Sequence, residues 1–274
     1  MAITTEDQLV AALVNGNKFP FLKASATSEG AGTLHSLWKV TGNPAAGVNP
    51  PLFSAGSGYI PTRTTQGAFP FTNPTNDAYL GKLGAQGGTI GTLIIYDRLW
   101  ACSGFGTVVL TEQTITTPGT LTPARDPNNG ADVEPWLEVY TAPGATGATW
   151  TFKGTDADGN ANRTWTYTHP ANAESVGQMM PLYPGGASPA SKLGCRVPTS
   201  FQASASSGTA GDIGVTLLRR LAEIPLTAAN VGIVLDAFAL GLPDVYDDAC
   251  LAMMVQCSTT NTGQINGTLV IARD

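Results

Sequence analysis

One short acidic segment carries the residue types best suited to chemistry in this chain. Asp156, Asp158 and Asn160 have the spacing of the first three oxygen ligands of a calcium-binding loop. The remaining pattern departs from such a loop, because Gly159 stands at the fourth position rather than the sixth and Tyr167 replaces the bidentate glutamate at the twelfth. Asp-Gly and Gly-Asn pairs are also strong turn formers. We therefore expect a β-hairpin turn without bound metal, and Asp156, Asp158 and Asn160 are the candidate ligands if calcium binds.

Residues in recognisable catalytic patterns are sparse. The chain has two histidines, His35 and His169, and it contains no GxSxG elbow, no GxxxxGK[ST] phosphate loop and no HExxH motif. Glu134 and Glu138 would share one face of a strand, but two carboxylates without a cleft signature do not define a glycosidase. Three aspartates are interpreted as a solvated acidic turn rather than a metal cluster: Asp244, Asp247 and Asp248. The sequence therefore predicts no enzymatic activity, no catalytic residue and no cofactor.

The composition indicates a turn-rich β protein with few surface charges. Glycine and proline number 32 and 19. Charged residues make up 12% of the chain, about half of the roughly 25% typical of soluble domains, which suits a surface covered by neighbours. The net charge of −6 argues against binding nucleic acid, because phosphate contacts need clustered Lys and Arg. Asp236 and Pro243 interrupt the longest apolar run, so we expect no membrane span.

The four cysteines are interpreted as structural thiols. Cys102, Cys195, Cys250 and Cys257 show no CxxC spacing and have no histidine close to them in the sequence. Free cysteine commonly behaves as a small apolar residue in a protein core. We expect all four to remain reduced within one subunit.

The elements that would position these residues are mostly strands that follow Gly91. Runs of β-branched and aromatic residues alternate there with Gly/Pro turns, a pattern typical of an antiparallel β-sandwich. The predicted strands are residues 92–100, 107–116, 133–140, 200–206, 214–224, 249–257 and 265–272, together with the two arms of the hairpin around Asp156. Residues 214–224 also fit a helix, because their leucines and Ile224 would lie on one side; the strand is the preferred interpretation.

The first residues predict a short helix. Thr5 and Gln8 have the spacing of a capping box, and an apolar stripe follows them. Asn15 and Gly16 supply a stop, so the helix should cover residues 5–15. Two placements stay open: the helix packs on its own domain, or it docks on a neighbouring subunit.

The chain after this helix lacks the apolar periodicity of a core. From residue 19 to residue 85 it is dominated by Gly, Pro, Ser, Thr and Asn, which is typical of a segment that wraps over something else. The predicted fold is therefore mainly β: a short N-terminal helix with an extended, loop-rich region over residues 1–88, and a jelly-roll-like β-sandwich body over residues 89–274. A chain starting near Gly88 should then fold but bind its partner poorly.

Several segments resemble signatures of virion structural proteins of tailed bacteriophages. They are Leu93–Trp100 (LIIYDRLW) with the CSGFGT that follows it, Gly208–Leu226 (GTAGDIGVTLLRRLAEIPL), Tyr246–Met254 (YDDACLAMM), Ser36–Trp38 and Ala68–Asn73 (AFPFTN). The resemblance extends over most of the chain. It implies a non-enzymatic component of the phage head, with a capsid decoration (cement) protein as the best match.

This resemblance implies a function and a set of partners. Such a protein binds the outside of a phage capsid and stabilises it, so its partners are the major capsid protein and copies of itself, with a trimer expected at a threefold site. Its location is the capsid surface of the virion, after synthesis in the bacterial cytoplasm. The alternative is a tail, fibre or host-attachment component. A third hypothesis is an enzyme or a carbohydrate-binding module, in which flat indole rings would stack on sugars: Trp136, Trp150 and Trp165.

Overall fold

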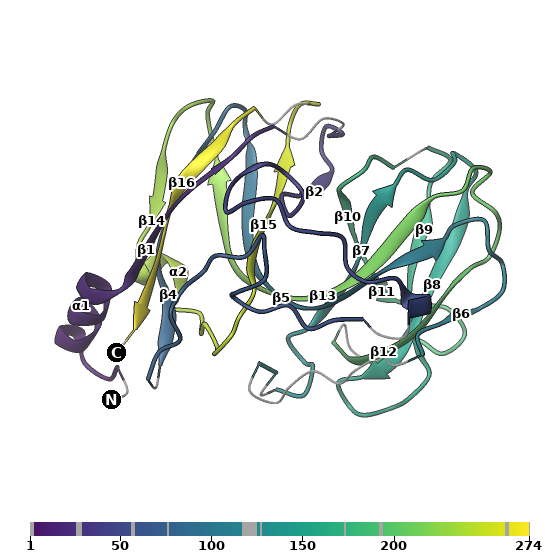
Figure 1. Cartoon of the computed structure of the whole chain (residues 1–274), viewed down its shortest axis with the longest axis horizontal. Coiled ribbons are helices and arrows are strands. Elements are labelled where there is room, and N and C mark those ends of the chain that lie inside the picture. Colours follow the sequence, from purple (N-terminus) through teal and green to yellow (C-terminus); the bar gives the residue numbers. More distant parts are fainter. Residues whose placement is uncertain are drawn as a thin grey trace. The chain divides into compact units, whose positions relative to one another are not determined.

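Strands dominate the computed structural model, which describes residues 3–25, 29–55, 58–75, 77–116, 125–126, 128–172, 174–191, 194–260 and 263–273. The sheets are antiparallel and a short helix precedes them, which confirms the predicted fold class (Figure 1). The chain forms two compact units, each assembled from separate stretches of sequence: Met1–Val48, Thr62–Asp97 and Arg220–Asp274 for unit 1, and Asn49–Pro61 and Arg98–Arg219 for unit 2.

The predicted division of the chain at residue 88 is not the division that the structure shows. Each unit contains residues from both sides of that position. Two long strands, β5 (Gly91–Gly106) and β13 (Asp212–Leu226), begin in one unit and end in the other. The units are therefore joined by continuous strands rather than by a linker at one point in the sequence.

Unit 1 begins with the helix that the capping box predicts. Helix α1 spans Glu6–Asn15, with Thr5 as its N-cap. The backbone N–H of Gln8 donates to the Thr5 hydroxyl at 3.3 Å, and the backbone N–H of Thr5 donates to Gln8 Oε1 at 3.1 Å. Within the described ranges, neither α1 nor any other helix is long and apolar enough to cross a membrane.

The first sheet of unit 1 has five strands in the order β14–β4–β16–β1–β3, and all neighbours are antiparallel. The strands are β1 (Asn17–Lys23), β3 (Gly42–Asn43), β4 (Ala78–Gly87), β14 (Ile233–Leu235) and β16 (Ile265–Arg273). Leu269 of the central strand β16 lies opposite Phe19 on one side and Leu83 on the other. The region predicted to be an extended arm therefore supplies three strands of this sheet.

The second sheet of unit 1 faces the first across a shared core. Strand β15 (Leu251–Cys257) lies between β2 (Leu34–Ser36) and the first residues of β5. Leu80 and Ile271 from the first sheet belong to the same buried cluster as Ile95 and Met253 from the second. This pairing of sheets is β-sandwich-like. The short helix α2 (Ala237–Leu240) follows β14.

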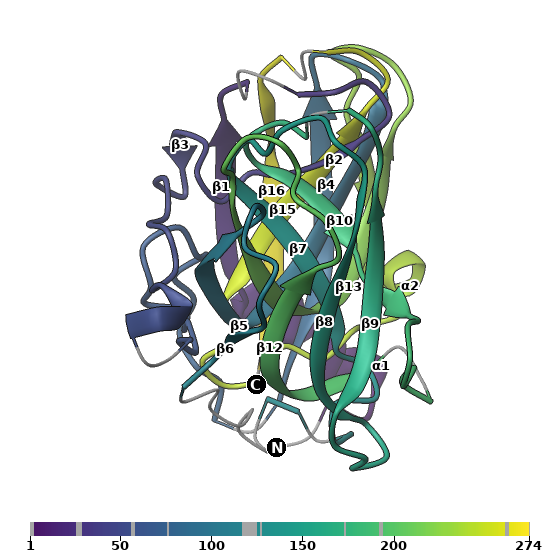
Figure 2. The same ribbon diagram turned by 90° about the vertical axis from the view of Figure 1, so that its right-hand side faces the viewer.

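Unit 2 repeats this layering with other strands. Its five-stranded sheet has the order β11–β9–β8–β12–β6. Strand β7 pairs with β10 and β13 and belongs with β2, β15 and β5 to one closed barrel of the order β10–β2–β15–β5–β13–β7. Strands β8, β9 and β12 run side by side in Figure 2. The bounds are η1 (Phe53–Ala55), β6 (Gln113–Thr114), β7 (Glu134–Thr141), β8 (Ala148–Asp156), β9 (Arg163–His169), β10 (Gln178–Pro181), β11 (Tyr183–Pro184) and β12 (Cys195–Ala203). Trp150 and Phe201 from one sheet share a core with Leu137 and Val215 from the other.

Two strand predictions have opposite outcomes. Residues 214–224 are strand, as preferred, within β13. Of the predicted strand 107–116, only Gln113 and Thr114 are strand. Before these two residues the chain turns, with Val109 N–H donating to Gly106 O at 3.2 Å. The Gln113 side chain holds this turn closed, since its Oε1 accepts from Gly106 N–H at 2.8 Å and its Nε2 donates to Gly106 O at 3.0 Å.

The cysteines are free and buried, as expected of structural thiols: Cys102, Cys195, Cys250 and Cys257. Burial raises the pKa of Cys102 and Cys195 far above the usual range of a thiol. For Cys257, burial together with the neighbouring Glu29 carboxylate raises the pKa to about 12. In these three cysteines the reactive thiolate form is therefore suppressed at neutral pH.

Candidate functional site

The acidic segment forms a hairpin turn between β8 and β9. The backbone N–H of Asp156 donates to Asn160 O at 3.1 Å, and the N–H of Gly159 donates to Asp156 O at 3.0 Å. Gly159 has φ +85°, a conformation that glycine adopts without strain. The strands then pair with Trp150 opposite Tyr167. The hairpin interpretation of this segment is confirmed.

The candidate calcium ligands are held by donors of the protein itself. The carboxylate of Asp156 is buried and accepts hydrogen bonds from Asn160 N (2.8 Å), Asn160 Nδ2 (3.2 Å) and Ser191 Oγ (3.1 Å), while Asp158 accepts from Ser191 Oγ. Burial alone would raise the pKa of Asp156, but these hydrogen bonds hold it below its ordinary value. Asn160 thus acts as a donor to Asp156. Across the described part of the chain, no three His, Cys, Asp or Glu side chains are grouped as a metal site would need.

This geometry predicts different roles for the two aspartates. Asp156→Ala should lower the free energy of unfolding by about 1–3 kcal/mol, because the turn loses the hydrogen bonds that Asn160 and Ser191 donate to the buried carboxylate. Asp158→Ala, at an exposed position, should cost no more than about 1 kcal/mol. Urea unfolding measures both values, and a chelator should leave the melting temperature of the wild type unchanged. A drop of several degrees on adding the chelator would restore the calcium hypothesis.

Both histidines have structural partners. His169 is buried, with Nδ1 2.7 Å from Glu174 Oε1 and Nε2 3.0 Å from Gly144 O, and its ring stacks on Trp150 at 4.4 Å between centroids. His35 Nε2 accepts from the N–H of Gly30 at 3.0 Å, and burial lowers the pKa of His35 to about 4. Neither imidazole reaches solvent, where it could exchange protons with a substrate.

Unit 2 also contains a buried ion pair. Arg98 Nη2 donates to Glu138 Oε2 at 2.7 Å and to the Tyr140 hydroxyl at 3.0 Å. Glu138 Oε2 also accepts from the hydroxyls of Tyr140 (2.7 Å) and Thr216 (3.2 Å). Arg98 and Glu138 are both inaccessible to solvent, so this ion pair links β5 to β7 inside unit 2.

The other sequence candidates do not form a binding site. The three indoles considered for sugar stacking are buried in the structure: Trp136, Trp150 and Trp165. Glu134 Oε2 accepts from Trp136 Nε1 at 2.9 Å, so it is not paired with Glu138. Of the three aspartates after Pro243, Asp248 accepts from Arg63 Nε at 3.1 Å.

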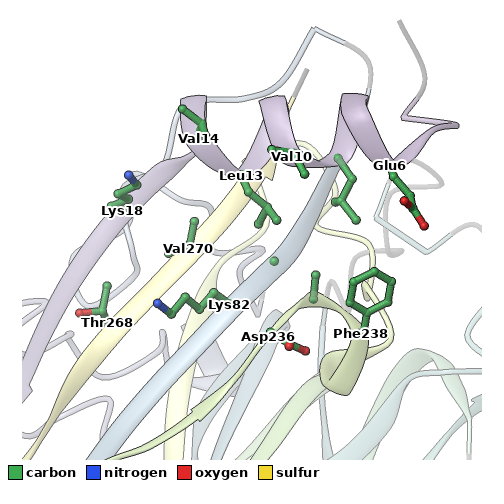
Figure 3. A pocket seen from close by; sticks show the side chains of 13 residues that line it. Glu6, Val10, Leu13, Val14, Lys18, Lys82, Asp236, Phe238, Thr268 and Val270 are labelled. Carbon is green, nitrogen blue, oxygen red and sulfur yellow. The ribbon is translucent and has the colours of Figure 1, made fainter.

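A groove that the sequence did not identify lies on unit 1. It encloses about 880 Å³ between α1, α2, β4 and β16 (Figure 3). Its apolar lining is Leu9, Val10, Leu13, Val14, Val270 and Phe238. Helix α1 can lie close to β4 because Gly81 has no side chain; a Cβ there would collide with Leu13. The shape of the groove therefore depends on the close contact between α1 and the sheet at Gly81.

The rim of this groove is apolar and charged at once. Phe238 is 77% exposed, and Val10 and Val14 are 59% and 66% exposed. Figure 3 shows two acids towards the beginning of α1 and two lysines towards its end: Glu6 and Asp236, and Lys18 and Lys82. In the described residues, no ion pair joins any of these four to one another. The sequence signal that could have revealed this groove was the broad apolar stripe of α1. One sheet face cannot cover all four of its aliphatic residues, which are Leu9, Val10, Leu13 and Val14.

Comparison with known proteins adds little. No protein-family model matches the chain, and no curated protein matches it. Among solved structures, one match is the crystal structure of the infectious bursal disease virus VP2 subviral particle. The match covers 95% of this chain and 81% of that chain, with 8% sequence identity and a TM-score of 0.17. A similarity at that level carries no argument about fold or function.

Proposed function

We propose that this protein is a non-enzymatic virion structural protein that binds the outside of a phage capsid and stabilises it, as decoration proteins do. The groove of unit 1 carries the proposal of a structural role, because it is a shaped, largely apolar, solvent-open surface with charged residues at its rim. Exposed apolar patches with charged rims are typical of protein contact sites. The resemblance of the LIIYDRLW and YDDACLAMM segments to phage virion proteins supplies the biological setting.

The fate of the polar side chains supports the same proposal. The ionisable groups suited to catalysis, His169 with Glu174 and Arg98 with Glu138, are enclosed in unit 2 and bonded to each other. A chain with only 12% charged residues also presents little repulsion to a neighbouring protein surface. These features suit contact with other proteins better than turnover of a substrate.

The test is reconstitution on capsids that lack the protein. Added purified protein should co-sediment with them and raise the temperature at which they release their DNA, because a ligand of the assembled state stabilises that state. The Asp158→Ala variant is the matched control and should act as the wild type does. Particles that neither bind the folded protein nor gain stability would favour the tail or fibre alternative, in which a handful of copies rather than hundreds is expected per virion.

A further inference from the structure

We propose that the groove of unit 1 binds the same groove of a second copy of this chain, so that the protein forms a twofold dimer through α1 and α2. The inference rests on the proposed role of the groove as a protein contact surface, and it names a second copy, rather than capsid protein, as the occupant of the groove. The contact is isologous: each copy offers the same surface and receives the same surface.

The apolar groove of one copy can receive the exposed Phe238 at the rim of the other copy. Phe238 stands 77% exposed beside a concave surface of about 880 Å³. Its position is fixed by local structure, because Asp236 Oδ1 caps α2 by accepting from Ala239 N at 2.9 Å and Gly241 ends the helix by donating to Phe238 O. An exposed aromatic side chain on a capped helix beside an apolar groove can enter the groove of a second copy as an anchor.

The order of charges along the groove identifies a copy of this chain as the occupant. Glu6 is the first residue of α1 and Lys18 follows its end, so the two lie on either side of a helix about 15 Å long. A twofold axis across the groove reverses the order in the second copy and sets Glu6 of each chain against Lys18 of the other. Asp236 and Lys82 are distributed in the same sense (Figure 3). A uniformly charged partner, or an acyl chain with one charged end, would match only half of this pattern.

Sedimentation of the full chain over a concentration series tests the inference. We expect a reversible monomer–dimer equilibrium for the wild type. Phe238→Asp should weaken dimerisation by roughly tenfold or more, since an exposed aromatic anchor is replaced by a charge. Tyr183→Asp is the matched control, because Tyr183 is an exposed aromatic residue (59%) on β11 of unit 2, and it should leave the equilibrium unchanged. Circular dichroism checks that each variant is folded.

A charge swap provides the sharper test. Glu6→Lys and Lys18→Glu should each weaken the dimer by placing like charges together, and the double variant should restore it, because it returns an opposite charge to each pair of residues 6 and 18. A wild type that stays monomeric, a trimer, or a dimer that Phe238→Asp leaves intact would overturn the proposal. So would binding of dodecanoate to the monomer that Phe238→Asp abolishes, because it would assign the groove to an acyl chain.

Capsid binding separates this inference from the proposed function. A wild type that dimerises through the groove but ignores capsids supports the dimer and removes the decoration role. A monomeric wild type that binds capsids, and loses that binding on Phe238→Asp, keeps the decoration role and overturns the dimer, because the groove would then hold capsid protein.

Discussion

Replacing Glu138 by leucine is expected to lower the free energy of unfolding by about 3–5 kcal/mol, because it leaves the buried guanidinium of Arg98 without its carboxylate. The hydroxyls of Tyr140 and Thr216 lose the same acceptor. Urea unfolding followed by circular dichroism measures the loss.

The double variant Arg98→Met with Glu138→Leu is the control for this prediction. Apolar residues of similar size often replace a buried ion pair at little cost, so the double variant should be more stable than Glu138→Leu alone. A single variant that loses less than about 1 kcal/mol would show that Arg98 does not depend on Glu138.

A chain that starts at Gly88 is expected not to form unit 1. The truncation removes β1 and β4, which are the two neighbours of β16, and so leaves the central strand of the sheet without a partner. It also removes Phe21, Leu80 and Leu83 from the core. The structure therefore reverses the expectation from composition, that such a chain folds and merely binds poorly, because the N-terminal region supplies strands and core residues to the sandwich.

Solubility and far-ultraviolet circular dichroism of the truncated chain check this prediction. A chain that lacks only residues 1–4 is the control, because it keeps the N-cap Thr5 and should fold like the wild type. A cooperative thermal transition in the chain from Gly88, at the temperature of the full chain, would contradict the expected loss of unit 1.

Strands were predictable from the sequence where apolar side chains form a continuous run. They were missed where contacts with distant residues, rather than the local pattern, determine the strand. The continuous apolar run of β15 and the capping box of α1 were visible without a structure. Strand β4 was not, because Gly81 and Gly84 interrupt its pattern, and Gly81 is there to admit Leu13 from a helix about seventy residues earlier in the chain. In β1, Pro20 hides the strand in the same way.

The candidate site was predictable only in part, for a similar reason. The hairpin around Asp156 is local, so its turn residues identify it. The groove is formed where α1 and α2 lie over β4 and β16. These elements are far apart in the sequence, so no local sequence pattern predicts that they come together. The burial of Trp136 likewise follows from how sheets stack and not from its neighbours in sequence.

The discontinuous make-up of the units has a consequence for synthesis on the ribosome. The stretches of unit 2 end at Arg219, so all of them have been translated while the nascent chain still lacks β16 of unit 1. Strands β1 and β4 then wait for β16 through the translation of about 240 and about 180 residues, at rates of roughly 5–20 residues per second. Their unpaired edges are exposed during those seconds, when a chaperone or a second nascent chain can reach them.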